Sequence, residues 1–352
     1  MSRRLPIYFL IDISESMVGE PIQQVEEGIS TIIQALKTDP NALETVWISI
    51  IIFAGQSKTL IPLQEIISFY PPKFPIGGGT SLSKGLGHLM YELRKNQVLT
   101  TPEKKGDWKP IVFLFTDGVP TDDSKIAISE WKKNWQRTAN MVAVSFGNET
   151  DTKLLGELTE NVLNFKNTNT ESYKHFFRWV TDSIKTSSES VENNKSGFEL
   201  SKLDGETISK IDLTKNTASN PYIDNNFVVI SAKCQNTKKP YLMKYRKNIS
   251  QSNLGGLVLD TLSYRLVGAY QVDNIYNELT DESTTNLKIN TNELIGAPTC
   301  PCCGNQFAFA ACQCGKIHCI GDEEMSICPW CENQGRYGAS GEGGFDVNRT
   351  QG

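Results

Sequence analysis

The sequence predicts a doubly wound α/β fold with a mostly parallel sheet over residues 1–190, followed by smaller units. Three observations predict it. Apolar segments of strand length alternate in this region with segments of helical periodicity. The strand candidates are almost continuously apolar, as expected when helices cover both faces of a sheet. Residues with oxygen-containing side chains follow the ends of two of these segments, where such sheets bind ligands.

Five strands and five helices are predicted in order along this region. In the first helix, Ile22, Val25 and Ile29 recur at a spacing that places them on one face. The strands are Ile7–Asp12, Val46–Phe53, Ile111–Thr116, Met141–Phe146 and Val162–Phe165. The helices are Ile22–Lys37, Leu82–Asn96, Lys125–Thr138, Lys153–Glu160 and Ser172–Lys185.

The rest of the chain divides into four predicted parts. Residues 191–219 are mostly polar and indicate a linker, and residues 220–297 indicate a small β-rich domain. Residues 298–332 form a cysteine-rich module resembling a zinc ribbon. The Gly-rich tail, residues 333–352, has few apolar residues, so we expect it to be disordered.

Composition narrows the functional classes. The net charge of -5, with no basic block, argues against broad nucleic-acid binding. The longest apolar run, Val46–Ala54, is far shorter than the roughly 20 residues that a membrane span needs. The basic start of the chain precedes only about seven apolar residues and no cleavage site, unlike a signal peptide. We therefore expect a soluble cytoplasmic protein.

Five oxygen donors suggest a metal site at the end of the predicted sheet. Asp12, Ser14 and Ser16 follow the first strand, Thr80 follows three glycines, and Asp117 follows the strand Ile111–Thr116. Two formal charges among five hard ligands suit a Mg²⁺-like ion that keeps an open coordination position, with Mn²⁺ or Ca²⁺ as alternatives. The DxSxS segment alone is also compatible with a helix cap. Its combination with the other two donors favours a metal site.

These five residues resemble the metal-ion-dependent adhesion site (MIDAS) of von Willebrand factor A domains, over about residues 5–190. The resemblance implies that Ser14 and Ser16 bind the ion directly and that Asp12 acts through water. Thr80 and Asp117 would alternate between direct and water-mediated contact. An acidic side chain of a protein partner would complete the coordination shell.

The segment after Asp117 narrows the resemblance further. The pattern TDGxPTD, which ends at Asp122, is similar to the TerY branch of these proteins, associated with tellurite resistance. Asp122 and Asp123 are candidates for an acidic rim of the metal site or for a cap of the helix at Lys125.

The cysteines predict zinc. Nine are present; Cys234 is isolated, and the other eight lie between Cys300 and Cys331. Two CPxC turns predict a primary four-thiolate site, and the remaining ligands suggest a possible second one; a redox or disulfide cluster is the alternative. The primary set is Cys300, Cys303, Cys328 and Cys331, and the second is Cys312, Cys314, His318 and Cys319, with Cys302 as a further candidate.

This cysteine pattern also resembles the C-terminal metal-binding domain of TerY proteins. Members of that family are typically encoded with a protein kinase and a metal-dependent protein phosphatase in bacterial stress or defence systems. The resemblance implies a non-catalytic adaptor in a phosphorylation-linked complex. Two alternatives remain: a metal-dependent phosphoesterase, and nucleic-acid binding by the zinc module. The acidic residues Asp322 and Glu323 near Lys316 do not favour the second alternative.

Overall fold

The structure is a computed structural model that forms two compact units, with the principal boundary between Tyr222 and Ile223. The residues it describes are 3–103, 105–117, 120–146, 152–165, 170–192, 200–202, 208–210, 226–254, 257–281, 287–323, 325–338 and 344–350. None of the helices in this described part combines the length and apolar character that a membrane crossing needs.

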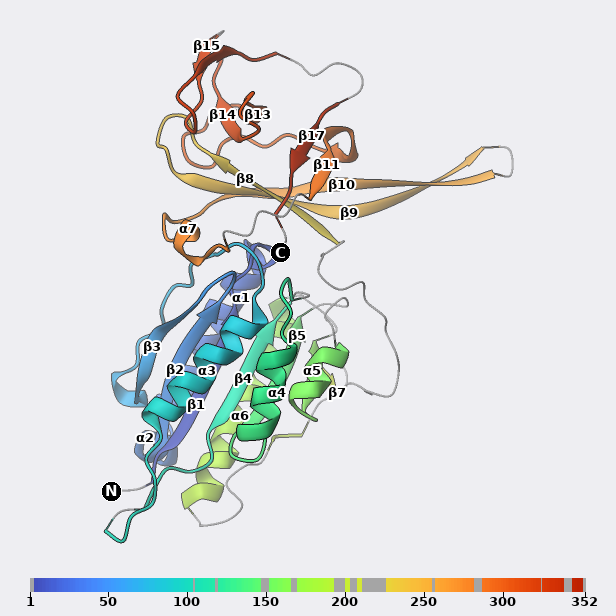
Figure 1. The fold of residues 1–352 in the computed structure, drawn as a ribbon. Helices are drawn as coiled ribbons and strands as arrows, with labels where there is room; N and C mark the ends of the chain where they lie inside the picture. The colour runs from blue at the N-terminus through green and yellow to red at the C-terminus, as the bar shows by residue number, and fades with distance from the viewer. Residues whose placement is uncertain are drawn as a thin grey trace. The chain divides into compact units, whose positions relative to one another are not determined.

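A seven-stranded sheet organises the first unit, in the order β3-β2-β1-β4-β5-β6-β7 (Figure 1). Its inner pairs are all parallel, and only the edge strands β3 and β7 run antiparallel to their neighbours. The strand order reverses at β1 and β4, so ligands are expected beyond their carboxyl ends. The strands are β1 (Leu5–Asp12), β2 (Val46–Phe53), β3 (Ser57–Glu65), β4 (Ile111–Thr116), β5 (Asn140–Phe146), β6 (Val162–Phe165) and β7 (Ile208–Lys210).

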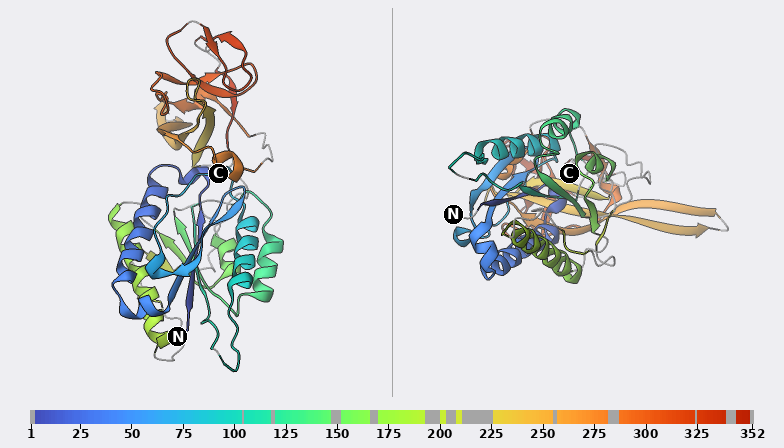
Figure 2. Two further views of the ribbon diagram at one scale, coloured as in Figure 1. Left: turned by 90° about the vertical axis from the view of Figure 1, so that its left-hand side faces the viewer. Right: turned by 90° about the horizontal axis from the view of Figure 1, so that it is seen from below.

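Helices cover both faces of this sheet. α1 and α6 lie on one face, and α3 and α4 lie on the other (Figure 2). The α-helices are α1 (Glu20–Lys37), α2 (Pro40–Thr45), α3 (Leu82–Asn96), α4 (Lys125–Asn134), α5 (Thr152–Leu158) and α6 (Thr170–Glu192). Two short 3₁₀ helices, η1 (Glu15–Met17) and η2 (Ile66–Ser68), lie in the connections.

Alternate residues of the central strands fill two cores. Tyr8 and Leu10 of β1 belong to the core beneath α3, α4 and α5. Phe9, between them, stacks on Phe113 of β4 at a centroid distance of 5.6 Å. On the same face Phe115 of β4 contacts Phe176 and Phe177 of α6.

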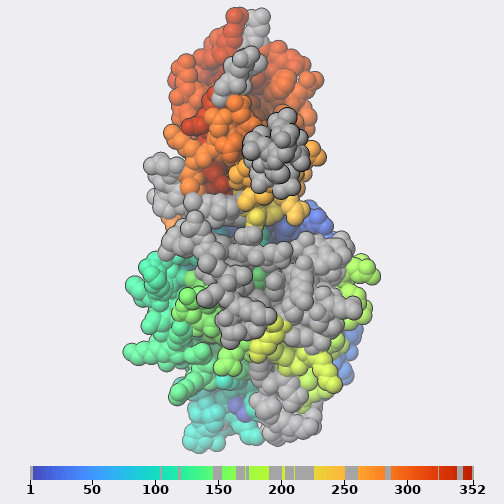
Figure 3. All heavy atoms as spheres, turned by 90° about the vertical axis from the view of Figure 1, so that its right-hand side faces the viewer, coloured from blue at the N-terminus to red at the C-terminus, as the bar shows by residue number. Residues whose placement is uncertain are grey.

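At the surface an ion pair of 2.8 Å joins Lys132 of α4 to Glu157 of α5, and both helices reach the face shown in Figure 3.

The doubly wound, mostly parallel fold predicted from the sequence is confirmed. All five predicted strands and all five predicted helices are present, with end points shifted by a few residues. β3 was not predicted, because its mixed burial and internal Pro62 are not typical of a strand. β7 was not predicted either, because it lies inside the predicted linker 191–219. Most of that linker lies outside the described residues.

The second unit is built on a six-stranded sheet in the order β12-β10-β9-β8-β14-β13. Two small two-stranded sheets, β11 with β17 and β15 with β16, complete it. The strands are β8 (Phe227–Lys233), β9 (Pro240–Leu254), β10 (Leu257–Gln271), β11 (Lys288–Asn290), β12 (Leu294–Ile295), β13 (Phe307–Ala311), β14 (Ile317–Ile320), β15 (Met325–Ile327), β16 (Gln334–Arg336) and β17 (Asp346–Asn348). The helices are α7 (Tyr276–Leu279) and η3 (Thr291–Glu293).

This sheet corrects two predicted boundaries. The β-rich part 220–297 and the cysteine module 298–332 are not separate, because β14 pairs with β8 in one sheet. Part of the tail 333–352 is also ordered: β16 pairs with β15, and β17 pairs with β11. These strands are only three residues long and depend on tertiary partners, so local composition could not reveal them.

Candidate metal centres

Asp12 is the last residue of β1 and is fully buried. Its Oδ2 accepts a hydrogen bond of 2.7 Å from the hydroxyl of Thr116, the last residue of the neighbouring strand β4. The parallel register brings these two strand ends together, so a carboxylate lies at the point where the strand order reverses. The hydrogen bond fixes the carboxylate but leaves it further oxygen lone pairs.

Ser14 and Ser16 lie on the turn that follows β1. Both are buried, and their hydroxyl oxygens are 3.0 Å apart. The short helix η1 begins at Glu15 and turns the chain so that two residues separated by one position face each other. Glu15 is itself buried, and its Oε2 accepts a hydrogen bond of 2.9 Å from the backbone amide of Gly79. Glu15 therefore ties the serine turn to the glycine loop, a role that the sequence analysis missed.

Thr80 supplies the main evidence that this site is built for an ion. Its side chain is buried, yet its hydroxyl oxygen has no hydrogen-bond partner among the described residues. Its backbone is firmly held: Thr80 N donates to Thr121 Oγ1, and Thr121 N donates to Thr80 O, both at 2.9 Å. A buried hydroxyl without a partner is costly, and coordination of a cation would satisfy it. The oxygen donors fit Mg²⁺.

Asp117 directly follows β4 and is partly buried. Gly118 and Val119, which come after it, lie outside the described residues. Asp117 thus lies at the carboxyl end of β4, the strand next to β1, as the fold predicts.

Asp122 has a different role from the two that the sequence suggested. Its Oδ2 accepts hydrogen bonds from the Ser81 hydroxyl at 2.6 Å, from the Ser83 amide at 3.1 Å and from the Ser83 hydroxyl. Asp122 therefore holds the beginning of α3, next to Thr80, and does not cap α4. Asp123 is the residue that accepts from the Lys125 amide, at 3.2 Å.

Eight cysteines in the second unit form two groups that can each hold a metal ion. Within each group all four sulfurs lie within 4.8 Å of one another. The first cysteine cluster is Cys234, Cys300, Cys303 and Cys319, and the second cysteine cluster is Cys312, Cys314, Cys328 and Cys331.

The sulfur spacing matches tetrahedral zinc. Four thiolates at about 2.3 Å from Zn²⁺ would be about 3.8 Å apart. Cys303 and Cys319 are 3.8 Å apart, and Cys234 and Cys319 are 3.9 Å apart. In the second cluster, Cys312 and Cys331 are separated by 3.7 Å and Cys314 and Cys328 by 3.9 Å. Both sets of ligands fit zinc.

This grouping corrects the predicted pairing. Cys300 and Cys303 do not share a site with Cys328 and Cys331, and neither His318 nor Cys302 belongs to a cluster. The two CPxC turns enter different clusters because β14, which carries Cys319, pairs with β8 just before Cys234. That pairing joins segments more than 80 residues apart, which spacing between cysteines cannot predict.

A repeated backbone turn presents these ligands. In the turn at Cys300 the carbonyl accepts from Gly304 N at 2.9 Å, and in the turn at Cys328 it accepts from Glu332 N at the same distance. The turn at Cys234 closes in the same way onto Lys238 N at 3.0 Å, and the turn at Cys312 is one residue shorter and closes onto Gly315 N at 2.8 Å. All four closing residues have left-handed φ angles, between 59° and 78°. The polar turn that begins at Cys234, between β8 and β9, was the signal that could have identified this ligand.

Hydrogen bonding favours the ionised form of one thiol in each cluster. Burial raises the pKa of Cys234, but hydrogen bonds from Thr237 and other donors outweigh it and bring that pKa to about 7. Burial also raises the pKa of Cys312, but hydrogen bonding, led by the Cys314 amide, outweighs it and brings that pKa to about 6. Burial raises the pKa of Cys300. Each cluster therefore has a thiol that ionises near neutral pH, as metal binding requires.

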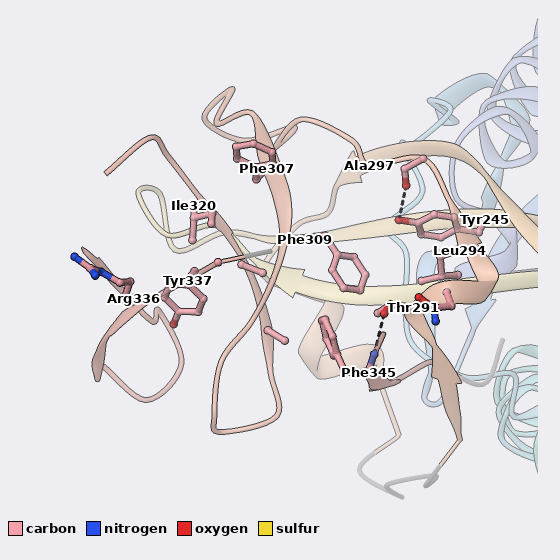
Figure 4. A pocket seen from close by; sticks show the side chains of 15 residues that line it. Tyr245, Thr291, Leu294, Ala297, Phe307, Phe309, Ile320, Arg336, Tyr337 and Phe345 are labelled. Carbon is pink, nitrogen blue, oxygen red and sulfur yellow. Dashed lines mark hydrogen bonds between the residues drawn. The ribbon is translucent and has the colours of Figure 1, made fainter. Parts of the chain in front are cut away.

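The second unit also contains a cavity of about 710 Å³, a volume typical of ligand pockets. Phe309 lies in its middle beside Phe345, with Tyr337 and Ile320 toward one end and Leu294 and Tyr245 toward the other (Figure 4). None of the predicted metal ligands lines it.

Comparisons with known proteins agree with this division. The model of the von Willebrand factor type A domain matches residues 7–179, and that of the TerY-C metal binding domain matches residues 224–352. The chain is therefore a von Willebrand factor type A domain protein. It belongs to the type that carries a C-terminal TerY-C metal binding domain, and this combination suggests metal-dependent protein interaction.

Solved structures resemble the chain at low sequence identity. One is proximal thread matrix protein 1 from the mussel byssus with a zinc-occupied MIDAS motif, at 19% identity and a TM-score of 0.38, covering 51% of this chain and 48% of that one. Another is a von Willebrand factor type A protein from Catenulispora acidiphila, at 11% identity and a TM-score of 0.39, covering 77% and 57%. The chain thus spans about half the length of the mussel protein. A comparison with curated protein sequences gives no match.

Proposed function

We propose that this protein is a non-catalytic adaptor that binds a protein partner through a divalent cation, Mg²⁺ in the first instance. The buried hydroxyl of Thr80, without a partner among the described residues, carries the proposal. Asp12, Ser14, Ser16, Thr80 and Asp117 would hold the ion. When bound, the ion would supply a positive charge that attracts a carboxylate.

The chain's own residues set the properties of this site. Thr116 orients Asp12, Glu15 fixes the glycine loop, and Thr121 holds the backbone of Thr80. These contacts keep the oxygen donors in place before any partner arrives, which lowers the entropic cost of binding. With only two carboxylates among the five donors, the ion would retain positive charge for an acidic side chain of the partner.

The proposal extends to the setting of the protein. The TerY-type combination of domains supports a Ser/Thr kinase and a metal-dependent protein phosphatase as partners, within a cytoplasmic phosphorylation system of bacterial stress or defence. Zinc in the two cysteine clusters would stabilise the C-terminal domain.

An affinity capture from the native host tests the proposal. Wild type, Ser14→Ala and Ser68→Ala would each be used with Mg²⁺ or with EDTA, and captured proteins identified by mass spectrometry. Ser68 is exposed and far in sequence from the predicted ligands, so its variant is the matched control. Because EDTA can also remove zinc, the Ser14 variant is needed to assign an effect to the oxygen site.

We expect a kinase or a phosphatase to be captured by wild type and Ser68→Ala with Mg²⁺, and to be lost with EDTA and with Ser14→Ala. Capture of the same partners under all six conditions would show that recognition does not use the cation site. Isothermal titration of the purified proteins with Mg²⁺ would confirm that Ser14→Ala removes ion binding.

A further inference from the structure

His318 is a buried polar residue that does not bind metal in either cysteine cluster. It is fully buried in β14, directly before Cys319 of the first cysteine cluster. Both of its ring nitrogens have partners: Nδ1 lies 2.9 Å from the carbonyl oxygen of Cys319, and Nε2 lies 2.9 Å from the hydroxyl of Tyr337. A carbonyl oxygen can only accept, so Nδ1 carries the hydrogen and Nε2 of the neutral ring accepts from Tyr337.

Tyr337 continues this chain of contacts into the second cysteine cluster. Its ring lies edge-on to the His318 ring, with centroids 4.9 Å apart and planes at 87°. Tyr337 directly follows β16, which pairs with β15, and β15 ends at the residue before Cys328 of the second cluster. A continuous path therefore leads from Cys319 through His318 and Tyr337 to the strand pair beside Cys328.

A second link runs in parallel. Trp330 lies between Cys328 and Cys331 of the second cluster, and its indole Nε1 donates a hydrogen bond of 2.8 Å to the carbonyl of Ile317. Ile317 precedes His318 in β14. Both links thus meet in one four-residue strand that also provides Cys319 to the first cluster.

We propose that His318 and Tyr337 are a positioning pair that couples the two cysteine clusters, so that zinc in one cluster increases the zinc affinity of the other. The inference rests on the zinc occupancy proposed above. Zinc at Cys319 would fix β14, and therefore the orientation of His318 and Tyr337. Tyr337 would then hold β16, and with it β15 beside Cys328, so part of the ordering cost of the second site would already be met.

Cobalt and zinc titrations of the metal-free full-length chain test this coupling. Co²⁺ bound by thiolates gives a charge-transfer absorption that counts filled sites, and competition with a chelator gives the affinity of each step. The variants are Tyr337→Phe, which keeps the ring and removes the hydroxyl, and Cys234→Ser, which disables the first cluster. Tyr91→Phe, at an exposed position in α3, is the control.

We expect wild type and Tyr91→Phe to bind two ions per chain. Cys234→Ser should bind one ion, about tenfold more weakly than the second cluster does in wild type. Tyr337→Phe should still bind two ions. When Cys234→Ser is added to this variant, the zinc affinity of the second cluster should no longer fall. His318→Gln, tested in the same way, should resemble Tyr337→Phe.

The outcomes separate this inference from the zinc proposal. No thiolate absorption in wild type would contradict zinc binding altogether. Binding of two ions by wild type would confirm zinc binding. The coupling would be overturned if neither Cys234→Ser nor Tyr337→Phe changed the affinity of the second cluster. Circular dichroism of each variant with zinc would show whether a weak result reflects unfolding, and the His318 variant keeps the test decisive if the Tyr337 variant does not fold.

Discussion

At the scale of single residues, Thr121 is the residue on which the position of Thr80 depends. It accepts from the Thr80 amide through its side chain and donates to the Thr80 carbonyl through its own amide. Thr121→Val would keep the shape but leave the Thr80 amide without its acceptor, a loss of about 1–3 kcal/mol. We therefore expect Mg²⁺ affinity to fall about tenfold, measured by isothermal titration.

The control for this change is Thr38→Val, because Thr38 is exposed and its hydroxyl donates to the nearby Ala35 carbonyl at the end of α1. Its Mg²⁺ affinity should equal that of wild type. Equal affinity in Thr121→Val would mean that the loop 120–123 does not position Thr80.

Residue patterns predicted the position of the oxygen donors in the fold better than they predicted the pairing of the cysteines. Asp12, Ser14 and Ser16 are neighbours in sequence, and β1 and β4 belong to a fold whose topology the alternation of elements indicates. The roles of Glu15 and Thr121 remained hidden, since each acts through a hydrogen bond to another loop. Cys234 was missed for a similar reason: its cluster forms only after a strand pairing over a long sequence distance.

At the scale of elements, the contact of α1 with α6 requires a glycine. A Cβ at Gly28 of α1 would lie 2.1 Å from ring carbons of Phe177 in α6, and Phe177 is buried. Gly28→Ala should therefore destabilise the first unit by about 1–3 kcal/mol through overpacking, more than alanine's gain in helix propensity. The expected observation is a lower midpoint of thermal unfolding for the full-length chain.

Gly87 of α3, in the same unit, is a matched control. It is exposed, and a Cβ there would meet nothing within 4 Å. Gly87→Ala should raise stability by about 0.5–1 kcal/mol, because only the helix propensity changes. If both variants shifted the midpoint in the same direction, close helix packing at Gly28 would be ruled out as the cause.

At the scale of the whole molecule, the two units should differ in their dependence on metal. The first unit has large apolar cores on both faces of its sheet, with Trp131 and Phe113 fully buried. The core of the second unit instead includes Cys234, Cys300 and Cys319 themselves. Without zinc these thiols would lose their shared ligand, and four tight turns would lose the contacts that hold them together.

Removal of zinc should therefore unfold the second unit selectively. With a zinc-selective chelator, amide hydrogen exchange should become fast in β8 and β14, while β1 and β4 keep their protection. Zn²⁺ added back should restore the slow exchange, and excess Mg²⁺ should not, because thiolates favour the softer ion. Equal loss of protection in β1 would show that the first unit also depends on zinc, whereas unchanged protection in β8 would show that the sheet is stable without it.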